Sequence, residues 1–139
     1  SGISYRCYAL ISDGECNEGT IWEAAMLAAA HEVDNLCVIV DFNGWQATGR
    51  SREVMRLDPM KEKWEAFGWH VVTIDGHDFT AMAGAFEVCA EIRGQPSVVI
   101  AETVKGKGVS FMEDDNNWHY RIPDEDELRL ALAELQDHR

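Results

Sequence analysis

The segment Ile11-Ser12-Asp13-Gly14-Glu15-Cys16-Asn17-Glu18-Gly19, together with Asp41-Phe42-Asn43-Gly44-Trp45, decides how this chain is interpreted. Each segment follows an apolar run typical of a strand, Tyr8 to Ile11 in one case and Leu36 to Val40 in the other. The alanine-rich stretch between the two runs is typical of a helix. A strand, a helix and a strand in this order predict two parallel neighbouring strands.

Asp13 and Asn43, thirty positions apart, then both fall at the carboxyl ends of these strands. Open α/β sheets bind ligands at that edge. A carboxylate and an amide oxygen that meet there suit a hard cation such as Mg²⁺, which keeps few protein ligands and completes its shell with phosphate and water. Gly14 lets the backbone pass close to a phosphate, and the N-terminal end of the following helix favours an anion. The sequence therefore predicts a site for a cation and a phosphate-bearing ligand.

These two segments resemble the thiamine-diphosphate motif, in which Gly-Asp-Gly is followed at a similar spacing by Asn. Two more segments are similar to the N-terminal subunit of a split transketolase, namely Glu18-Gly19-Thr20-Ile21-Trp22-Glu23-Ala24-Ala25 and the stretch from Val104 to Glu113 that closes on Trp118-His119. The motifs are separated and follow the family's order over nearly the whole chain. We therefore expect a diphosphate-binding subunit of the transketolase type.

The resemblance implies a role for each motif residue. Mg²⁺ (or Ca²⁺ or Mn²⁺) is expected to bind Asp13, Asn43 and the backbone carbonyl of Trp45. Thiamine diphosphate is expected to contact the same three residues and also Ser12, Gly14 and Glu15. Ser12 stands where the family has its first Gly. Without the family context, Asp13 would be interpreted as a turn residue or a helix cap, and Asn43 would be interpreted as a turn amide before Gly44.

His119 and Glu18 match family positions with catalytic roles. His119 corresponds to a histidine that contacts cofactor and substrate, where a neutral imidazole can move a proton or hydrogen-bond an alkoxide. The family usually has Gly after this residue, whereas Tyr120 stands here. Glu18 corresponds to a glutamate in a hydrogen-bonded link between active sites near the dimer interface. The alternatives are an ordinary loop histidine and an acidic residue that stabilises a helix N-terminus.

The activity that the resemblance implies is thiamine-diphosphate-dependent transfer of a two-carbon ketol unit from a ketose to an aldose. Two alternatives stay open. One is a dehydrogenase or decarboxylase component that uses the same cofactor, to which Asn43-Gly44-Trp45 has some likeness. The other is a non-catalytic scaffold subunit that retains the fold. The Val104 to Glu113 segment and Trp118-His119 favour transketolase.

Family subunits usually carry a further segment upstream of the first strand and rely on a pyrimidine-binding domain, and this sequence shows neither. The resemblance therefore implies activity only with partners. One is a C-terminal transketolase-like subunit with the pyrimidine-binding domain, and the other is a chain or segment that supplies the missing N-terminal part. Substrates are expected to be small sugars, with or without a phosphate group.

Composition bounds the class of protein. The chain has 139 residues, which indicates one domain over 1–139, and a net charge of −13, which argues against nucleic acid and anionic membranes as partners. No apolar run reaches the roughly 18 residues of a membrane span, and no signal-peptide pattern opens the sequence, so we expect a cytoplasmic protein. Free thiols are expected rather than disulfides or zinc ligands, with only Cys16 accessible among Cys7, Cys16, Cys37 and Cys89.

Strand and helix patterns alternate along the rest of the chain. We expect strands over 5–12, 36–42, 69–74 and 97–103, and helices over 19–32, 59–67, 80–93 and from 123 onwards. This alternation predicts an α/β fold, a doubly wound, mostly parallel sheet flanked by helices; the resemblance makes it the diphosphate-type thiamine-diphosphate-binding fold, truncated at its N-terminus.

Several local features accompany these elements. Asp58 is expected to cap the second helix with Pro59 at its first position, and Gly68 to end it in a left-handed conformation. We expect residues 44–55 to form a surface loop and His77 to serve a turn. In the last helix, most of the apolar contacts are expected from Leu128, Leu132 and Leu135.

Overall fold

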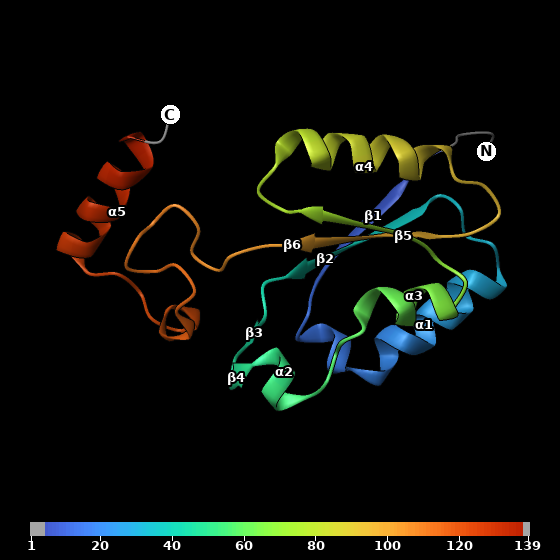
Figure 1. Cartoon of the computed structure of the whole chain (residues 1–139), viewed down its shortest axis with the longest axis horizontal. Coiled ribbons are helices and arrows are strands. Elements are labelled where there is room, and N and C mark those ends of the chain that lie inside the picture. The colour runs from blue at the N-terminus through green and yellow to red at the C-terminus, as the bar shows by residue number, and fades with distance from the viewer. Residues whose placement is uncertain (1–4, 138–139) are drawn as a thin grey trace.

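A four-stranded parallel sheet forms the centre of the protein (Figure 1), whose computed structural model describes residues 5–137. Its strands are β1 (Cys7–Ser12), β2 (Leu36–Phe42), β5 (His70–Asp75) and β6 (Ser97–Glu102), in the order β1-β2-β6-β5. Each pair of neighbours runs parallel. The expected parallel α/β sheet is therefore confirmed.

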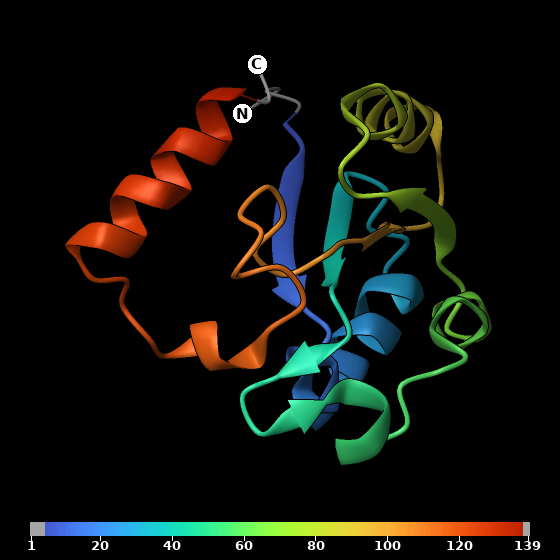
Figure 2. The same cartoon turned by 60° about the vertical axis from the view of Figure 1, so that its left-hand side comes forward.

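Helices cover both faces of this sheet, as the doubly wound prediction required. Helices α1 (Gly19–Ala30) and α3 (Met60–Ala66) lie on one face, and α4 (Phe79–Glu91) lies on the other (Figures 1 and 2). Because side chains alternate along a strand, β2 sends Val38 and Val40 to the α1 and α3 face and Cys37 to the α4 face. The sheet therefore has two separate apolar layers.

The larger layer depends on the small residues of α1. Ala25 and Ala28 are buried, and the indole Nε1 of Trp69 donates a 2.9 Å hydrogen bond to the carbonyl of Ala25. Trp64 packs against Trp69 with ring centroids 4.8 Å apart. Alanine side chains let these large rings approach the helix backbone, which holds α1 close to the sheet.

The strand ends are aligned by the register. Ser12 of β1 pairs with Asp41 of β2, and Asp41 pairs with Ala101 of β6. Strand β5 keeps the same alignment, since Asp75 pairs with Glu102. The residues that follow each strand therefore meet at one edge of the sheet.

The segment expected as a surface loop has structure of its own. It contains β3 (Trp45–Gln46), β4 (Gly49–Arg50) and the short helix α2 (Ser51–Val54), and Ser51 is buried. The two short strands pair antiparallel. The expectation of a loop was wrong, because the segment forms these elements and Ser51 packs against Asp13 at the end of β1; its surface position is confirmed, since Ser51 is the one buried residue among 44–55.

The start of α3 also differs from the prediction. Pro59 precedes the helix with extended backbone (φ −80°, ψ 111°), and no side chain caps α3. Asp58 is therefore one residue too far from the first turn to cap it. The side chain of Asp78 does cap its helix, α4, by accepting hydrogen bonds from the backbone N–H groups of Thr80 and Ala81. Gly68 has φ +85°, which confirms the left-handed end of α3.

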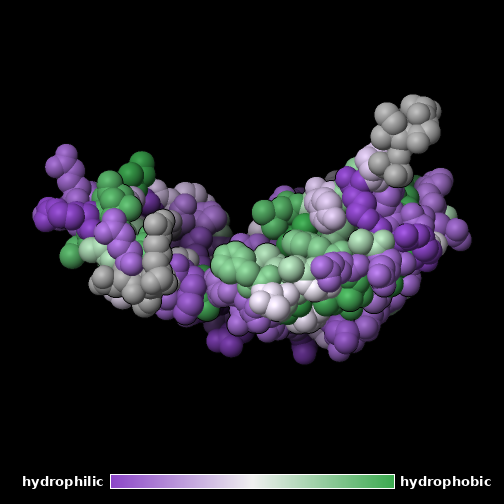
Figure 3. Space-filling view, turned by 90° about the horizontal axis from the view of Figure 1, so that it is seen from above, coloured by the Kyte–Doolittle hydropathy of each residue, from purple (hydrophilic) through white to green (hydrophobic). Residues whose placement is uncertain are grey.

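The C-terminal helix α5 (Glu125–Asp137) stands away from the sheet (Figure 1), beyond a loop and the 3₁₀ turn η2 (Asn116–His119). Leu128, Leu132 and Leu135, expected to supply most of the helix's apolar contacts, remain 49%, 51% and 46% exposed and are only half covered, whereas Ala131 is buried. Figure 3 shows hydrophobic side chains at the surface of this outlying part. The helix contacts the preceding loop instead. Its Glu134 accepts hydrogen bonds from the N–H (2.5 Å) and the hydroxyl Oγ (2.7 Å) of Ser110, which belongs to that loop.

The cysteines are free, as expected, but their exposure is reversed. Cys7 is exposed, whereas Cys16 is buried together with Cys37 and Cys89. The 3₁₀ turn η1 (Glu15–Asn17) directs Cys16 into the larger apolar layer, and burial raises the pKa of its thiol to about 12. Among the helices of residues 5–137, none has the length and apolar character to cross a bilayer.

Candidate functional site

Asp13 lies directly after β1 and is completely buried, with 0% exposure. Its Oδ2 accepts hydrogen bonds from the backbone N–H of Gly44 (2.9 Å) and the hydroxyl of Ser51 (2.7 Å). Its Oδ1 is buried and has no hydrogen-bond partner within the described part of the chain. Burial raises the pKa of this carboxyl above its ordinary value, although both hydrogen bonds lower it. A buried carboxylate oxygen without a donor is costly, and a cation would offset that cost.

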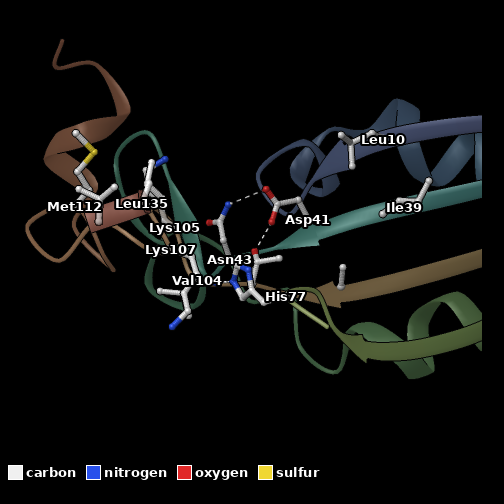
Figure 4. A pocket seen from close by; sticks show the side chains of 14 residues that line it. Leu10, Ile39, Asp41, Asn43, His77, Val104, Lys105, Lys107, Met112 and Leu135 are labelled. Carbon is white, nitrogen blue, oxygen red and sulfur yellow. Dashed lines mark hydrogen bonds between the residues drawn. The ribbon is translucent and has the colours of Figure 1, made fainter. Parts of the chain in front are cut away.

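Asn43 follows β2 and is held by its neighbours (Figure 4). Its Nδ2 donates to Asp41 Oδ2 (3.4 Å), and its Oδ1 accepts from the backbone N–H of Trp45 (2.9 Å). Asp41 also accepts a hydrogen bond from the hydroxyl of Thr103, which follows β6. Residues at the ends of β2 and β6, together with Trp45 of β3, therefore fix the orientation of one amide.

The hydrogen bond from the Gly44 N–H to Asp13 joins the segments that follow the carboxyl ends of β2 and β1. Asp13 and Asn43 therefore lie at the same edge of adjacent parallel strands, as the sequence predicted. The oxygens available there belong to one carboxylate, one amide and nearby carbonyls, which suit a hard cation. No cluster of three or more His, Cys, Asp or Glu side chains that could hold a metal occurs between residues 5 and 137. The contribution of the Trp45 carbonyl stays a prediction.

Ser12 and Glu15 pair with each other across η1. The Ser12 N–H donates to Glu15 Oε2 (2.8 Å), and the Glu15 N–H donates to Ser12 Oγ (3.2 Å). This reciprocal pattern braces the turn after Asp13 in the manner of a capping box. Gly14 has φ −62°, and a Cβ there would lie 3.6 Å from Ser12 and Gln46, so this chain alone leaves room for a side chain.

A second polar pair lies beside this turn. Asn17 Nδ2 donates to Gln46 Oε1 (2.7 Å), while Asn17 Oδ1 and Gln46 Nε2 are buried without partners in the part of the chain that the structure describes. Gln46 belongs to β3, so the pair joins η1 to the segment after Asn43. The unpaired Asn17 oxygen and Gln46 nitrogen therefore provide one further acceptor and one further donor beside Gly14, close to Asp13.

Trp45 connects the Asp13–Asn43 site, which we call the cation corner after the ion proposed to bind there, to residues 103–122 after β6, which we call the C-terminal segment. Its indole Nε1 donates to Asp114 Oδ1 (2.8 Å), and the Arg50 guanidinium lies 3.6 Å from its ring centroid. Arg50 also bonds both carboxylate oxygens of Asp114, at 2.6 Å and 2.5 Å. The hydrogen bonds from Arg50 and Trp45 lower the pKa of Asp114 to about 2.

His119 lies on this C-terminal segment, in η2, and is exposed. Its Nδ1 is 3.3 Å from Lys105 Nζ, and its ring meets the Tyr120 ring edge-on with centroids 4.6 Å apart. Trp118 anchors the turn, since its Nε1 donates to the carbonyl of Phe111 (2.9 Å). The contacts described for His119 are thus with its own segment, and the Asp114–Arg50 pair links that segment to the cation corner.

Glu18 stands at the N-cap of α1, exposed, and its side chain makes no capping hydrogen bond. A side-chain hydrogen bond is therefore not what Glu18 contributes to the helix, although its charge lies at the N-terminus of α1, where the helix dipole favours an acidic residue. Its role between active sites stays a prediction. His77 has the structural role expected of it. Its Nε2 accepts a hydrogen bond from the backbone N–H of Val104 (2.8 Å), which fixes where the C-terminal segment leaves the sheet.

A hollow of about 650 Å³ adjoins the cation corner on the α4 side of the sheet (Figure 4). Strand side chains Leu10 and Ile39 form one wall, and Lys105 and Met112 of the C-terminal segment form another. Asp41 and Asn43 lie between the two walls. The hollow therefore runs from the strand ends toward the segment that carries His119.

Three residues of the site were missed by sequence reasoning. Asp41 orients Asn43, and its position two residues earlier at the strand end was an available signal. Ser51 donates to Asp13 from 38 positions away, and Asp114 reaches Arg50 across 64 positions. No local pattern marks either residue, because each contact depends on how two distant segments fold together.

Comparison with known proteins shows the family to which the chain belongs. Residues 2–135 match the family model described as "Transketolase, thiamine diphosphate binding domain". The chain belongs to this transketolase family. It is 43% identical, over 99% of its length, to a subunit of the apulose-4-phosphate transketolase of Actinobacillus succinogenes, and 42% identical over 93% to the 6-deoxy-6-sulfo-D-fructose transketolase subunit SqwG of Clostridium sp..

The match to these transketolase subunits covers only part of them. The chain spans 49% of the Actinobacillus protein and 47% of the Clostridium protein. Among solved structures, transketolase from Campylobacter jejuni superposes with a TM-score of 0.79 at 25% identity, over 98% of this chain and 25% of that one. The fold is therefore the thiamine-diphosphate-binding fold of transketolases.

Proposed function

We propose that this chain is the diphosphate-binding part of a split transketolase, which transfers a two-carbon ketol unit from a ketose to an aldose. The observation that carries the proposal is the Oδ1 of Asp13, buried and unpartnered among residues 5–137, at the tip of a strand that lies against Asn43. Family membership supports thiamine diphosphate as the cofactor. Bound thiamine diphosphate supplies the carbanion chemistry, and the protein supplies orientation and electrostatics.

Mg²⁺, or Ca²⁺ or Mn²⁺ in its place, would bind Asp13 and Asn43 together with the Trp45 carbonyl. Gly44 N–H and the Ser51 hydroxyl hold one Asp13 oxygen, so the other is left for the ion. Asp41 holds the Asn43 amide from its nitrogen side, and the amide oxygen accepts one hydrogen bond from the Trp45 N–H, which leaves its second lone pair for the ion. Ser12, Gly14 and Glu15 would lie against the diphosphate, with the N-terminal end of η1.

The proposed partners are a subunit with the pyrimidine-binding domain and a chain or segment that completes the diphosphate domain. Strand β1 is one of the two outer strands of the described sheet, and Tyr8 and Leu10 on its α4 side are 54% and 72% exposed. An outer strand with exposed apolar side chains favours association with further protein. The names of the relatives, which describe transketolase subunits, support the same conclusion.

The substrates would be small sugars with an anionic group. The relatives' names refer to a sugar phosphate in one case and a sulfonated sugar in the other. This chain carries a net charge of −13, so residues of the partners would have to balance the substrate's charge. His119, on the segment that lines the hollow, would contact cofactor and substrate, and Glu18 would link neighbouring active sites.

Isothermal titration of the chain, assembled with its C-terminal partner subunit, tests cofactor binding. Thiamine diphosphate with Mg²⁺ should bind the unmodified complex, and Asp13→Ala should abolish Mg²⁺-dependent binding. Asp34→Asn is the matched control, because Asp34 lies at the opposite end of the strands, where it accepts a hydrogen bond from Gly94. Retained cofactor affinity in the Asp13 variant would contradict the assignment.

A ketol-transfer assay on the same complex separates the alternatives. Binding with ketol transfer supports the transketolase. Binding with release of CO₂ from a 2-oxo acid would point to the decarboxylase or dehydrogenase type. Absence of binding, in a complex shown to be assembled, would point to a scaffold subunit.

A further inference from the structure

Lys105 and His119 are held together by a tightly folded loop. Val104 N–H bonds to His77 on one side of Lys105, and the Lys105 carbonyl accepts a hydrogen bond from Asp114 N–H (2.9 Å). Gly106 has φ +72°, and a Cβ there would lie 2.5 Å from the Met112 carbonyl oxygen. Only glycine fits this turn without strain. The backbone that carries Lys105 is therefore fixed relative to the segment that carries His119.

The contact between the two side chains determines where the imidazole proton lies. Lys105 Nζ is 3.3 Å from His119 Nδ1, and a lysine ammonium has donors but no acceptor. Nδ1 must therefore accept, which places the proton of the neutral imidazole on Nε2. The Tyr120 ring lies edge-on to the imidazole at 4.6 Å and limits its rotation.

We propose that Lys105 is a positioning residue that holds His119 as its Nε2–H tautomer, so that His119 serves as a hydrogen-bond donor to an oxygen of substrate or cofactor and not as a base. This inference rests on the proposed function and deepens it. A fixed donor aimed at a developing oxyanion stabilises charge without reorganisation.

Lys107 provides a matched control on the same loop. Its Nζ is 3.5 Å from Glu113 Oε1, so its charge already has a partner of opposite sign. Substitution of Lys107 changes the charge of the loop by the same amount as substitution of Lys105. It leaves the contact with His119 in place.

Long-range ¹H–¹⁵N NMR of the imidazole groups tests the tautomer without reference to activity. His119→Gln assigns the resonance. The unmodified chain should show His119 protonated at Nε2, with a nuclear Overhauser effect between the Lys105 ε-methylene and a His119 ring proton. Lys105→Glu replaces the donor by an acceptor and should move the proton to Nδ1, whereas Lys107→Glu should not. An unchanged tautomer in Lys105→Glu, or a missing Overhauser effect, would overturn the proposal.

Kinetics of the assembled enzyme test the consequence. Lys105→Met should lower kcat roughly tenfold, less than complete removal of a stabilising donor, with KM and cofactor affinity nearly unchanged. Lys107→Met is the control. A rise in KM or loss of cofactor affinity at constant kcat would show that Lys105 binds the ligand directly, and would overturn the positioning role. If the unmodified complex transferred no ketol unit, the proposed function would fail, while the NMR result would still decide the tautomer.

Discussion

Arg50 and Asp114 form a two-bond ion pair, at 2.6 Å and 2.5 Å, across 64 positions of the chain. Arg50 ends β4, in the segment that follows Asn43, and Asp114 precedes the turn that carries His119. Trp45 joins the pair through its indole N–H and its ring face. The proposed cation corner and the proposed catalytic histidine are thus connected through one exposed cluster, which we call the Arg50–Asp114–Trp45 joint.

Arg50→Lys tests what the joint contributes. Lysine keeps the charge but loses the paired geometry and the flat contact with the Trp45 ring. We expect faster hydrogen exchange over residues 110–122 and a loss of cofactor affinity of roughly fivefold or less, since exposed pairs contribute little. Arg52→Lys is the control, because its contact with Glu53 is long, at 4.0 Å, and exposed. Equal exchange rates in the two variants would contradict the connection.

The Arg50–Asp114–Trp45 joint should lose its ion pair at low pH, when the carboxylate of Asp114 becomes protonated. Arg50 and Trp45 lower the pKa of Asp114 from 3.8 to about 2. A lowered folded-state pKa means that the stabilisation is complete above about pH 4 and disappears as the pH falls toward 2. The indole N–H resonance of Trp45 should therefore shift with a midpoint near pH 2. Asp114→Asn should remove that titration, and a midpoint near 4 in the unmodified chain would refute the assignment.

Ser51→Ala should destabilise the protein through Asp13. Ser51 is buried, and its hydroxyl is one of two donors to a buried carboxylate. Loss of such a donor typically costs roughly 1–3 kcal/mol in the free energy of unfolding. Urea unfolding measures this cost, with Ser110→Ala as the control, because Ser110 is exposed and bonds Glu134 of α5. A change equal to that of the control would mean that Asp13 does not depend on Ser51.

Cys7 reports on whether protein covers β1. In the isolated chain its thiol is exposed, so maleimide should label it within minutes, while Cys16, Cys37 and Cys89 stay protected. In the complete assembly, labelling of Cys7 should slow at least about tenfold if a partner covers that strand. Cys7→Ser is the control for the site of labelling. Undiminished labelling in the assembly would place the partner elsewhere.

The sequence predicted the parts of the site that depend on strand ends. Asp13 and Asn43 meet because two parallel strands joined by one helix must end at the same edge, and their apolar runs marked both ends. Ser51 and Asp114 could not be predicted, since their contacts join distant segments and depend on the path of each loop. The spacing of the leucines in α5 predicted the helix correctly but not how exposed these side chains are, because periodicity shows which side of a helix is apolar and not what lies against it. Asp58-Pro59 matched a helix-start pattern, yet the extended backbone of Pro59 moved the start to Met60.

The position of β1 has a further consequence. Asp13 follows β1, one of the two outer strands of the described sheet, and we propose that a partner lies beside this strand. The affinity of Asp13 for an ion would then be high only after the partner has bound. Copies of this chain in excess over the partner subunit would then bind no thiamine diphosphate. The cofactor would be bound by assembled complexes and not by unassembled subunits.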